Sequence, residues 1–222
     1  MKIVFISDTH RRHEQLNFND KKYKNVDMII HSGDFSNYEK DADKFIQWYS
    51  EQPFKYKILI PGNHDFAVFK NEKKYIEFSK KLGIELLIDR KISIEGINIY
   101  GSPWTPEFFN WAYMKNDHIL KEIWDKIPYD THILVTHGPA KGSLDKSNYG
   151  NIEVGSFSLS TKLYDLKENG NLKIHSFGHI HEARGFYKEN DLLRINSSSV
   201  NHKYQIEEPF IVDYEKNDLI FN

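Results

Sequence analysis

Histidine, aspartate and asparagine recur beside glycine or a turn at five points of the sequence, each after a hydrophobic run. The residues are Asp8 and His10, Asp34, Asn63 with His64 and Asp65, His137, and His179 with His181. Residues two positions apart in an extended chain project from the same face, so His179 and His181 can point at one ligand. Imidazole, carboxylate and amide groups offer the nitrogen and oxygen atoms that bind metals. The set therefore predicts metal chemistry.

Composition narrows the kind of site and partner. The chain has no cysteine, so a metal must be held by nitrogen and oxygen rather than by thiolates. Thirty basic residues against 32 acidic ones give a net charge of −2, which argues against extended nucleic acid as a partner. The first hydrophobic run is too short for a signal peptide or a membrane span, so we expect no membrane partner and a cytoplasmic location.

Hydrophobic runs of strand length precede these polar groups. They cover residues 2–7, 26–32, 56–62, 97–102, 132–138 and 172–178. Helical patterns lie between several of them, such as the apolar stripe of Ala42, Phe45, Ile46 and Tyr49. In α/β sheets ligands bind at the carboxyl ends of strands, so the polar residues that follow the runs should converge on one cleft.

Segment 85–102 predicts a hairpin with its turn near Asp89 and Arg90, followed by another strand. Strands continue after the last helical pattern, because segments 185–198 and 209–222 predict two more hairpins. Two sheets packed together with helices outside fit this order better than one open sheet. The 222 residues are within the range of one domain, and we expect a single domain over residues 1–222.

The order of the polar motifs resembles that of the calcineurin-like metallophosphoesterases. The motifs are DTH, GD, GNHD, THG and GHIH, spread over residues 8–181. The chain is most similar to the small brain-type metallophosphoesterase-domain proteins, through KFIQWYSEQPFKYKILIPGNHD, GSPWTPEF, THGP, FGHIHE and INSS. The resemblance implies an α/β fold in which two mixed β-sheets pack face to face with helices outside, a four-layer αββα sandwich.

The resemblance also implies a site for two metal ions. One ion would be held by Asp8, His10, Asp34 and His181, and the second by Asp34, Asn63, His137 and His179. Two cations on one water make hydroxide available near neutral pH, and this bridging hydroxide would attack phosphorus. We expect manganese in assays, although iron, zinc, cobalt and nickel also suit these ligands as divalent or trivalent ions.

His64 and Asp65 are the predicted catalytic residues. His64 would donate a proton to the leaving ester oxygen, and Asp65 would orient the imidazole of His64. The expected activity is hydrolysis of phosphodiesters of small organic or nucleotide groups, cyclic nucleotides included. The alternatives are a phosphomonoesterase or a nuclease with the same site, and a scaffold protein that keeps the fold without catalysis.

The residues that bind the rest of the substrate are not identified by these motifs. The aromatic segment 102–117, which contains Trp104 and Trp111, is either a packed cover over a sheet edge or an apolar wall on which a base stacks. The glycine-rich segment 138–158 predicts a loop at the rim of the site. The sequence does not indicate the oligomeric state.

Overall fold

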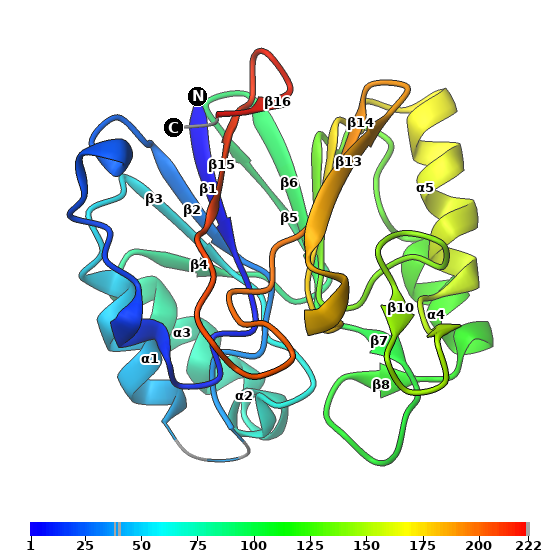
Figure 1. Cartoon of the computed structure of the whole chain (residues 1–222), viewed down its shortest axis with the longest axis horizontal. Coiled ribbons are helices and arrows are strands. Elements are labelled where there is room, and N and C mark those ends of the chain that lie inside the picture. The colour runs from blue at the N-terminus through cyan, green and yellow to red at the C-terminus, as the bar shows by residue number, and fades with distance from the viewer. Residues whose placement is uncertain (38, 40, 221–222) are drawn as a thin grey trace.

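Two six-stranded sheets form the centre of the protein. We obtained a computed structural model, which describes residues 1–37, 39 and 41–220 (Figure 1). In order across the first sheet, the strands are β16 (Asp218–Leu219), β15 (Phe210–Asp213), β1 (Lys2–Ile6), β2 (Met28–His31), β3 (Tyr56–Leu59) and β4 (Ile84–Leu86). Across the second sheet they are β13 (Gly185–Glu189), β14 (Leu192–Asn196), β12 (Ile174–Phe177), β9 (Ile133–Thr136), β6 (Ile97–Ser102) and β5 (Arg90–Ile94).

Both sheets are mixed. Strands β1 to β4 run parallel to their neighbours, whereas β15 and β16 pair in antiparallel fashion at one edge of the first sheet. In the second sheet β14, β12, β9 and β6 are parallel, and β13 and β5 pair antiparallel at the two edges. The parallel strands of each sheet therefore deliver their carboxyl ends to a common edge.

Helices cover the outer side of each sheet (Figure 1). Beside the first sheet lie α1 (Ala42–Ser50), α2 (Phe66–Lys70) and α3 (Glu72–Lys81), and beside the second lie α4 (Asp117–Trp124) and α5 (Phe157–Asn169). Short 3-10 helices occur at η1 (His13–Gln15), η2 (Lys21–Tyr23) and η3 (His181–Ala183). No helix among residues 1–37, 39 and 41–220 is long and apolar enough to cross a membrane.

The hydrophobic core has three layers. Alternate residues of β1 face different layers, because side chains alternate across a strand. Val4 and Ile6 pack with the helices outside the first sheet, whereas Ile3 and Phe5 pack between the two sheets. A third cluster joins the second sheet to α4 and α5. These three apolar layers separate four structural layers, which confirms the expected αββα sandwich.

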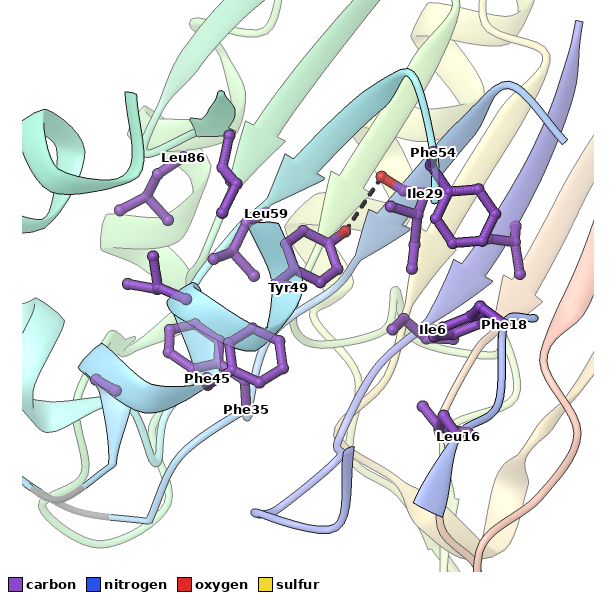
Figure 2. Packing of buried hydrophobic residues seen from close by; sticks show 14 of the residues in the cluster. Ile6, Leu16, Phe18, Ile29, Phe35, Phe45, Tyr49, Phe54, Leu59 and Leu86 are labelled. Carbon is purple, nitrogen blue, oxygen red and sulfur yellow. Dashed lines mark hydrogen bonds between the residues drawn. The ribbon is translucent and has the colours of Figure 1, made fainter. Parts of the chain in front are cut away.

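Tyr49 shows how a helix is attached to the first sheet. Its hydroxyl donates to the carbonyl oxygens of Ile29 at 3.1 Å and Ile58 at 2.8 Å, and the first of these bonds is drawn in Figure 2. The ring of Phe45 stacks on that of Phe35 with centroids 4.5 Å apart. Burying a side chain of this size contributes about 1.5–3 kcal/mol, so α1 is held mainly by its apolar face.

The hairpin predicted for segment 85–102 is wrong. Strand β4 pairs with β3 in the first sheet, and β5 pairs with β6 in the second, so the chain crosses between sheets near Asp89. The hairpin turn lies instead at Glu95 and Gly96, which both have positive φ angles, 49° and 80°. Positive φ at both central residues is typical of a two-residue hairpin turn that matches the strand twist.

The two later hairpins are confirmed by the pairs β13–β14 and β15–β16, although residues 221–222 of the second prediction lie outside the described residues. Two small ribbons flank the large sheets. One joins β7 (Thr105–Pro106) to β8 (Met114–Lys115), and the other joins β10 (Lys146–Ser147) to β11 (Ile152–Glu153). They lie in the aromatic segment and in the glycine-rich segment of the sequence, respectively.

Candidate metal centre

Each predicted ligand follows the carboxyl end of a strand. In the first sheet Asp8 and His10 follow β1, Asp34 follows β2, and Asn63 follows β3. In the second sheet His137 follows β9, and His179 and His181 follow β12. The structure brings all of these side chains, together with His64, to one place where the two sheets meet.

Asp34 lies at the centre of this group. Its Oδ2 atom is 3.4 Å from Nε2 of His137, 3.8 Å from Nε2 of His10 and 3.9 Å from Nε2 of His64. The side chain is 2% exposed, so water does not screen these contacts. A carboxylate with imidazoles on several sides is placed to contact two cations at once.

Two sets of potential ligands flank Asp34. In one set Asp8, His10 and His181 bring their ligand atoms within 4.8 Å of one another, as do Asp34, His137 and His179 in the other. The Nε2 atoms of His10 and His181 are 3.2 Å apart, and Oδ1 of Asn63 lies 2.8 Å from Nε2 of His137. A third set of the same kind joins His10, Asp34 and His64, so Asp34 takes part in two of the three sets.

The orientation of the imidazoles fits metal binding. Nδ1 of His137 donates to the carbonyl oxygen of Ser32 at 2.9 Å, and Nδ1 of His10 lies 3.1 Å from Oδ1 of Asn37. Outer partners of this kind leave Nε2 facing inward, as they do in histidines that bind metals. Nitrogen and oxygen lone pairs then face one another across short gaps, and a cation between them would satisfy them. The sequence indicated no role for Asn37.

The carboxylates and imidazoles of this cluster shift one another's pKa. Burial raises the pKa of the Asp8 carboxyl, but the hydrogen bond and positive charge of His181 outweigh burial and lower it overall. Burial lowers the pKa of His137, whereas the Asp34 carboxylate acts in the opposite direction and raises it to about 9. Burial and the neighbouring His137 lower the pKa of His179 to about 3. Burial raises the pKa of Asp34 as well, but His137 and His64 outweigh burial and lower it overall. The Asp8 and Asp34 carboxylates thus stay ionised and attract positive charge.

The backbone of the site is strained. Asp8, His10, Asp34 and His179 have φ angles of 49°, 42°, 59° and 70°, in the left-handed region. This conformation costs an L-residue roughly 1–2 kcal/mol, and such residues cluster where function requires the geometry. Gly178 lies beside them, where an added Cβ would be 2.0 Å from Oδ2 of Asp8. Only glycine allows this close approach of the two loops.

Asp65 joins the loops that carry Asp34 and Asn63. Its Oδ2 accepts from the backbone N–H of Asp34 at 2.9 Å and of Gly62 at 2.7 Å, and its Oδ1 accepts from the backbone and hydroxyl of Ser36. The carboxylate is fully buried. These bonds indicate that Asp65 holds two ligand loops in register, while its role in orienting the His64 imidazole stays a prediction.

His31 makes a similar connection that the sequence did not indicate. It is the last residue of β2 and is fully buried. Its Nδ1 accepts from the backbone N–H of Gly33 at 3.1 Å, so Nε2 carries the proton and donates to the Thr9 hydroxyl at 3.2 Å. Burial lowers the pKa of His31 to about 3, which keeps the ring neutral. The loop of Asp8 and His10 is thereby tied to the loop of Asp34.

Aromatic rings surround the candidate ligands. In segment 102–117, Trp104 donates from Nε1 to Oδ2 of Asp89 at 2.8 Å and forms part of a packed cover. Trp111 of the same segment lies beside His64, with ring centroids 4.3 Å apart. The ring of Tyr204 contacts the rings of His10 and His181, with ring centroids 5.4 and 5.3 Å apart. The sequence did not indicate that the loop of Tyr204 borders the site.

The chain is similar in sequence to a family of metal-dependent phosphoesterases and to several known proteins. The calcineurin-like phosphoesterase family matches residues 1–183. Human metallophosphoesterase domain-containing protein 1 is 30% identical over 237 residues, which cover 96% of this chain and 70% of the human protein. A UPF0046 protein of Caenorhabditis elegans is 31% identical over 228 residues, which cover 96% of this chain and 75% of the nematode protein.

Solved structures share the fold at low identity. A protein from Thermus thermophilus has a TM-score of 0.66 at 14% identity, covering 99% of this chain and 96% of that one. A structure described as a novel archaeal phosphodiesterase has a TM-score of 0.57 at 20% identity, covering 99% and 98%. With residues 1–183 matched and relatives at about 30% identity across its length, the chain belongs to the calcineurin-like phosphoesterase family.

Proposed function

We propose that the protein hydrolyses phosphodiesters of small organic or nucleotide groups, cyclic nucleotides included. The observation that carries the proposal is the position of Asp34, whose carboxylate lies between one set of ligands from Asp8, His10 and His181 and another from His137 and His179. This arrangement suits two cations about 3.5–4 Å apart, as in other two-metal phosphoesterases.

The proposed ligands are Asp8, His10, Asp34 and His181 for one ion and Asp34, Asn63, His137 and His179 for the other. When bound, the ions supply hydroxide near neutral pH and neutralise charge on the phosphoryl oxygens. The donors are nitrogen and oxygen only, which suits manganese, iron, zinc, cobalt or nickel. We propose manganese as the activating ion in assays, with iron or zinc as the ions held in cells.

His64 is the proposed general acid. Its Nε2 lies 3.9 Å from the Asp34 carboxylate, and its side chain is 23% exposed, so it reaches both the centre of the site and the solvent side. A proton donated from this position to the ester oxygen stabilises the leaving group as its bond to phosphorus breaks. The protein itself forms no covalent bond to the substrate in this scheme.

Two observations support a small diester as the substrate. The fold neighbour described as an archaeal phosphodiesterase covers nearly the whole chain. The net charge of −2 gives little attraction for extended nucleic acid, whose binding usually depends on several phosphate contacts. Phosphomonoesterase and nuclease activities use the same chemistry and differ in the substrate that fits the rim.

A substrate panel tests the proposal directly. Protein stripped of metal and reloaded with manganese is assayed on phosphomonoesters, cyclic nucleotides, dinucleotides and single-stranded nucleic acid. We expect the highest kcat/KM on a small diester and none without metal. A preference for monoesters or nucleic acid would replace the diester assignment. Inactivity on every ester with manganese, iron, zinc, cobalt and nickel would favour a scaffold.

A further inference from the structure

Tyr204 and Trp111 adjoin different imidazoles of the candidate site. Trp111 lies beside the proposed general acid His64, with ring centroids 4.3 Å apart. Tyr204 contacts His10 and His181, two proposed ligands of the same ion, with its ring tilted 67° and 89° to theirs. The ring of His10 lies between the two regions, 4.9 Å from the ring of His64. The site thus has an aromatic wall beside the acid and another beside the ligand pair.

The loop that carries Tyr204 is built around Asn201. The Oδ1 atom of Asn201 accepts from the backbone N–H groups of Lys203 at 2.9 Å and Gln205 at 3.1 Å, and its carbonyl accepts from Tyr204 at 2.8 Å. Tyr204 adopts a left-handed φ of 58°, which a non-glycine residue keeps only when its surroundings enforce it. The loop therefore fixes the position of the ring.

Tyr204 is nevertheless 42% exposed, although its ring contacts the buried imidazole of His10 and the partly buried imidazole of His181. A large ring that is held in place, borders the site and stays open to solvent on one side is suited to contact a ligand.

In the diester reaction a water oxygen bonds to phosphorus, the bond to the leaving oxygen breaks, and that oxygen takes the proton of His64. The released water proton restores His64, so atoms and charge balance.

The two organic groups of a diester then occupy different places. The leaving group must lie beside His64, which places it against Trp111. The other group stays bonded to phosphorus and must lie away from the acid. We infer that Tyr204 forms the wall of a subsite for this retained group, and that the subsite prefers planar aromatic or nucleoside-like groups. The inference rests on the proposed diester hydrolysis and adds which residue selects the retained group.

Phosphonate monoesters separate the two groups, because the carbon bonded to phosphorus cannot leave. We compare p-nitrophenyl phenylphosphonate with p-nitrophenyl methylphosphonate, which share the leaving group, on the manganese-loaded protein. The wild-type protein should prefer the phenyl ester in kcat/KM. Tyr204→Ala should reduce this preference about tenfold, mainly through KM, whereas Tyr204→Phe should keep it, because the aromatic contact remains. Tyr204→Leu tests the same point with a side chain that fills more of the loop.

Two control variants distinguish contact between Tyr204 and the retained group from a purely structural role of Tyr204. Trp111→Ala should slow both esters equally and leave the phenyl preference unchanged. The surface control Tyr164→Ala, on α5 and 66% exposed, should change neither rate nor preference. An equal loss on both esters in Tyr204→Ala, or a wild-type protein without phenyl preference, would overturn the inference.

Binding provides a readout that does not depend on turnover. Phenylphosphonate and methylphosphonate are not hydrolysed, and calorimetry on the manganese-loaded protein gives their dissociation constants. The wild-type protein should bind phenylphosphonate more tightly, and Tyr204→Ala should lose about tenfold of this advantage. If the wild-type protein hydrolyses no ester but shows this binding difference, the proposed function fails while the subsite stands. If turnover is present and the binding difference is absent, only the subsite fails.

Discussion

Oδ2 of Asp34 lies 3.4 Å from Nε2 of His137, although the two residues come from different sheets. Asp34 follows β2 of the first sheet and His137 follows β9 of the second. The backbone N–H of Gly178, before His179, donates to the carbonyl oxygen of His137 at 2.9 Å, which fixes the two loops of the second sheet to each other. The candidate centre therefore exists only when the two sheets are packed together.

Asp34→Asn tests the shared ligand. The amide keeps the shape of the side chain but offers one oxygen and no negative charge. We expect bound metal to fall from about two ions per chain to one or none. Removing an outer partner of a ligand costs about 10–100-fold, so losing the shared ligand should lower kcat by more than about 100-fold. Elemental analysis of the protein and steady-state kinetics measure the two effects.

Asp130→Asn is the control for this substitution. Asp130 is exposed and pairs with Lys91 at 2.7 Å on the second sheet. It should keep full metal content and full rate. If Asp34→Asn retained the wild-type metal content, the carboxylate would not be the shared ligand.

His64→Ala tests the general acid. The variant should keep its metals and lose about 10²–10⁴-fold in kcat on esters whose leaving alcohol is weakly acidic. The loss should be smaller with p-nitrophenol as leaving group, because this group departs without a proton. Rates on an alkyl and a p-nitrophenyl ester, with metal content measured in parallel, give the comparison. His118→Ala on α4 alters an exposed imidazole and should behave as wild type. Equal losses on both esters would rule out proton donation by His64.

Asp65→Asn tests the connection between two ligand loops. Two of its four hydrogen-bonded donors would face an amide N–H₂ instead of an oxygen, and each donor left without an acceptor costs about 1–3 kcal/mol in unfolding free energy. Metal affinity should fall about 10–100-fold, because Asp34 and Asn63 lose their common support. Urea unfolding of the metal-free protein and metal titration measure the two quantities.

Asp145→Asn is the matched buried control. Asp145 is 2% exposed and accepts from the backbone N–H of Gly155 at 3.0 Å, in the rim segment. It should also lose stability but keep its metal affinity. If both variants lost metal affinity to the same degree, the specific role of Asp65 would be refuted.

The positions of the proposed ligands at strand ends could be predicted from the sequence, because strand ends carry strong local signals. Asp34 beside Gly33 and His137 beside Gly138 each end a hydrophobic run, and parallel strands bring such ends to one edge. Segment 85–102 has the same apolar pattern on both sides of Asp89, so no local feature indicated that the chain changes sheets there. The sheet that each strand joins is decided by its neighbour in the fold, because β4 pairs with β3 in the first sheet and β5 pairs with β6 in the second.

Outer partners of the site were not predictable for a different reason. Tyr204 and Asn37 reach His10 from loops whose paths depend on contacts across the fold. His31 lies within a strand, where its spacing is that of an ordinary core residue, and its partners Thr9 and Gly33 come from two loops. The spacing of residues in the sequence predicts the proposed ligands that directly follow strands. It does not predict the side chains from other loops and strands that contact those ligands.

His175 is a buried imidazole outside the metal centre. The Thr136 hydroxyl donates to the carbonyl oxygen of Gly138 at 2.7 Å and lies 2.8 Å from Nε2 of His175, so Nε2 must be the donor to it. Burial, and then the positive charge of Arg194, lower the pKa of His175 well below its usual value. The ring is therefore neutral in the folded protein.

This neutrality predicts acid sensitivity. The unfolded chain binds a proton at His175 below about pH 6.5 while the folded protein does not, so folding stability falls as pH decreases through that range. In His175→Gln the amide N–H₂ can still donate to Thr136 but does not titrate. Between pH 6 and pH 5 the wild-type unfolding free energy should fall more steeply than that of the variant, by up to about 1.4 kcal/mol per pH unit.

Urea unfolding of the metal-free proteins at several pH values measures this difference in slope. The proposed metal ligands are the same in both proteins, so their contribution cancels in the comparison. His202→Gln replaces an exposed imidazole and should keep the wild-type slope. Identical slopes for the wild type and His175→Gln would mean that His175 takes up its proton without unfolding. A neutral ring held between Thr136 and the core could then not be the source of acid sensitivity.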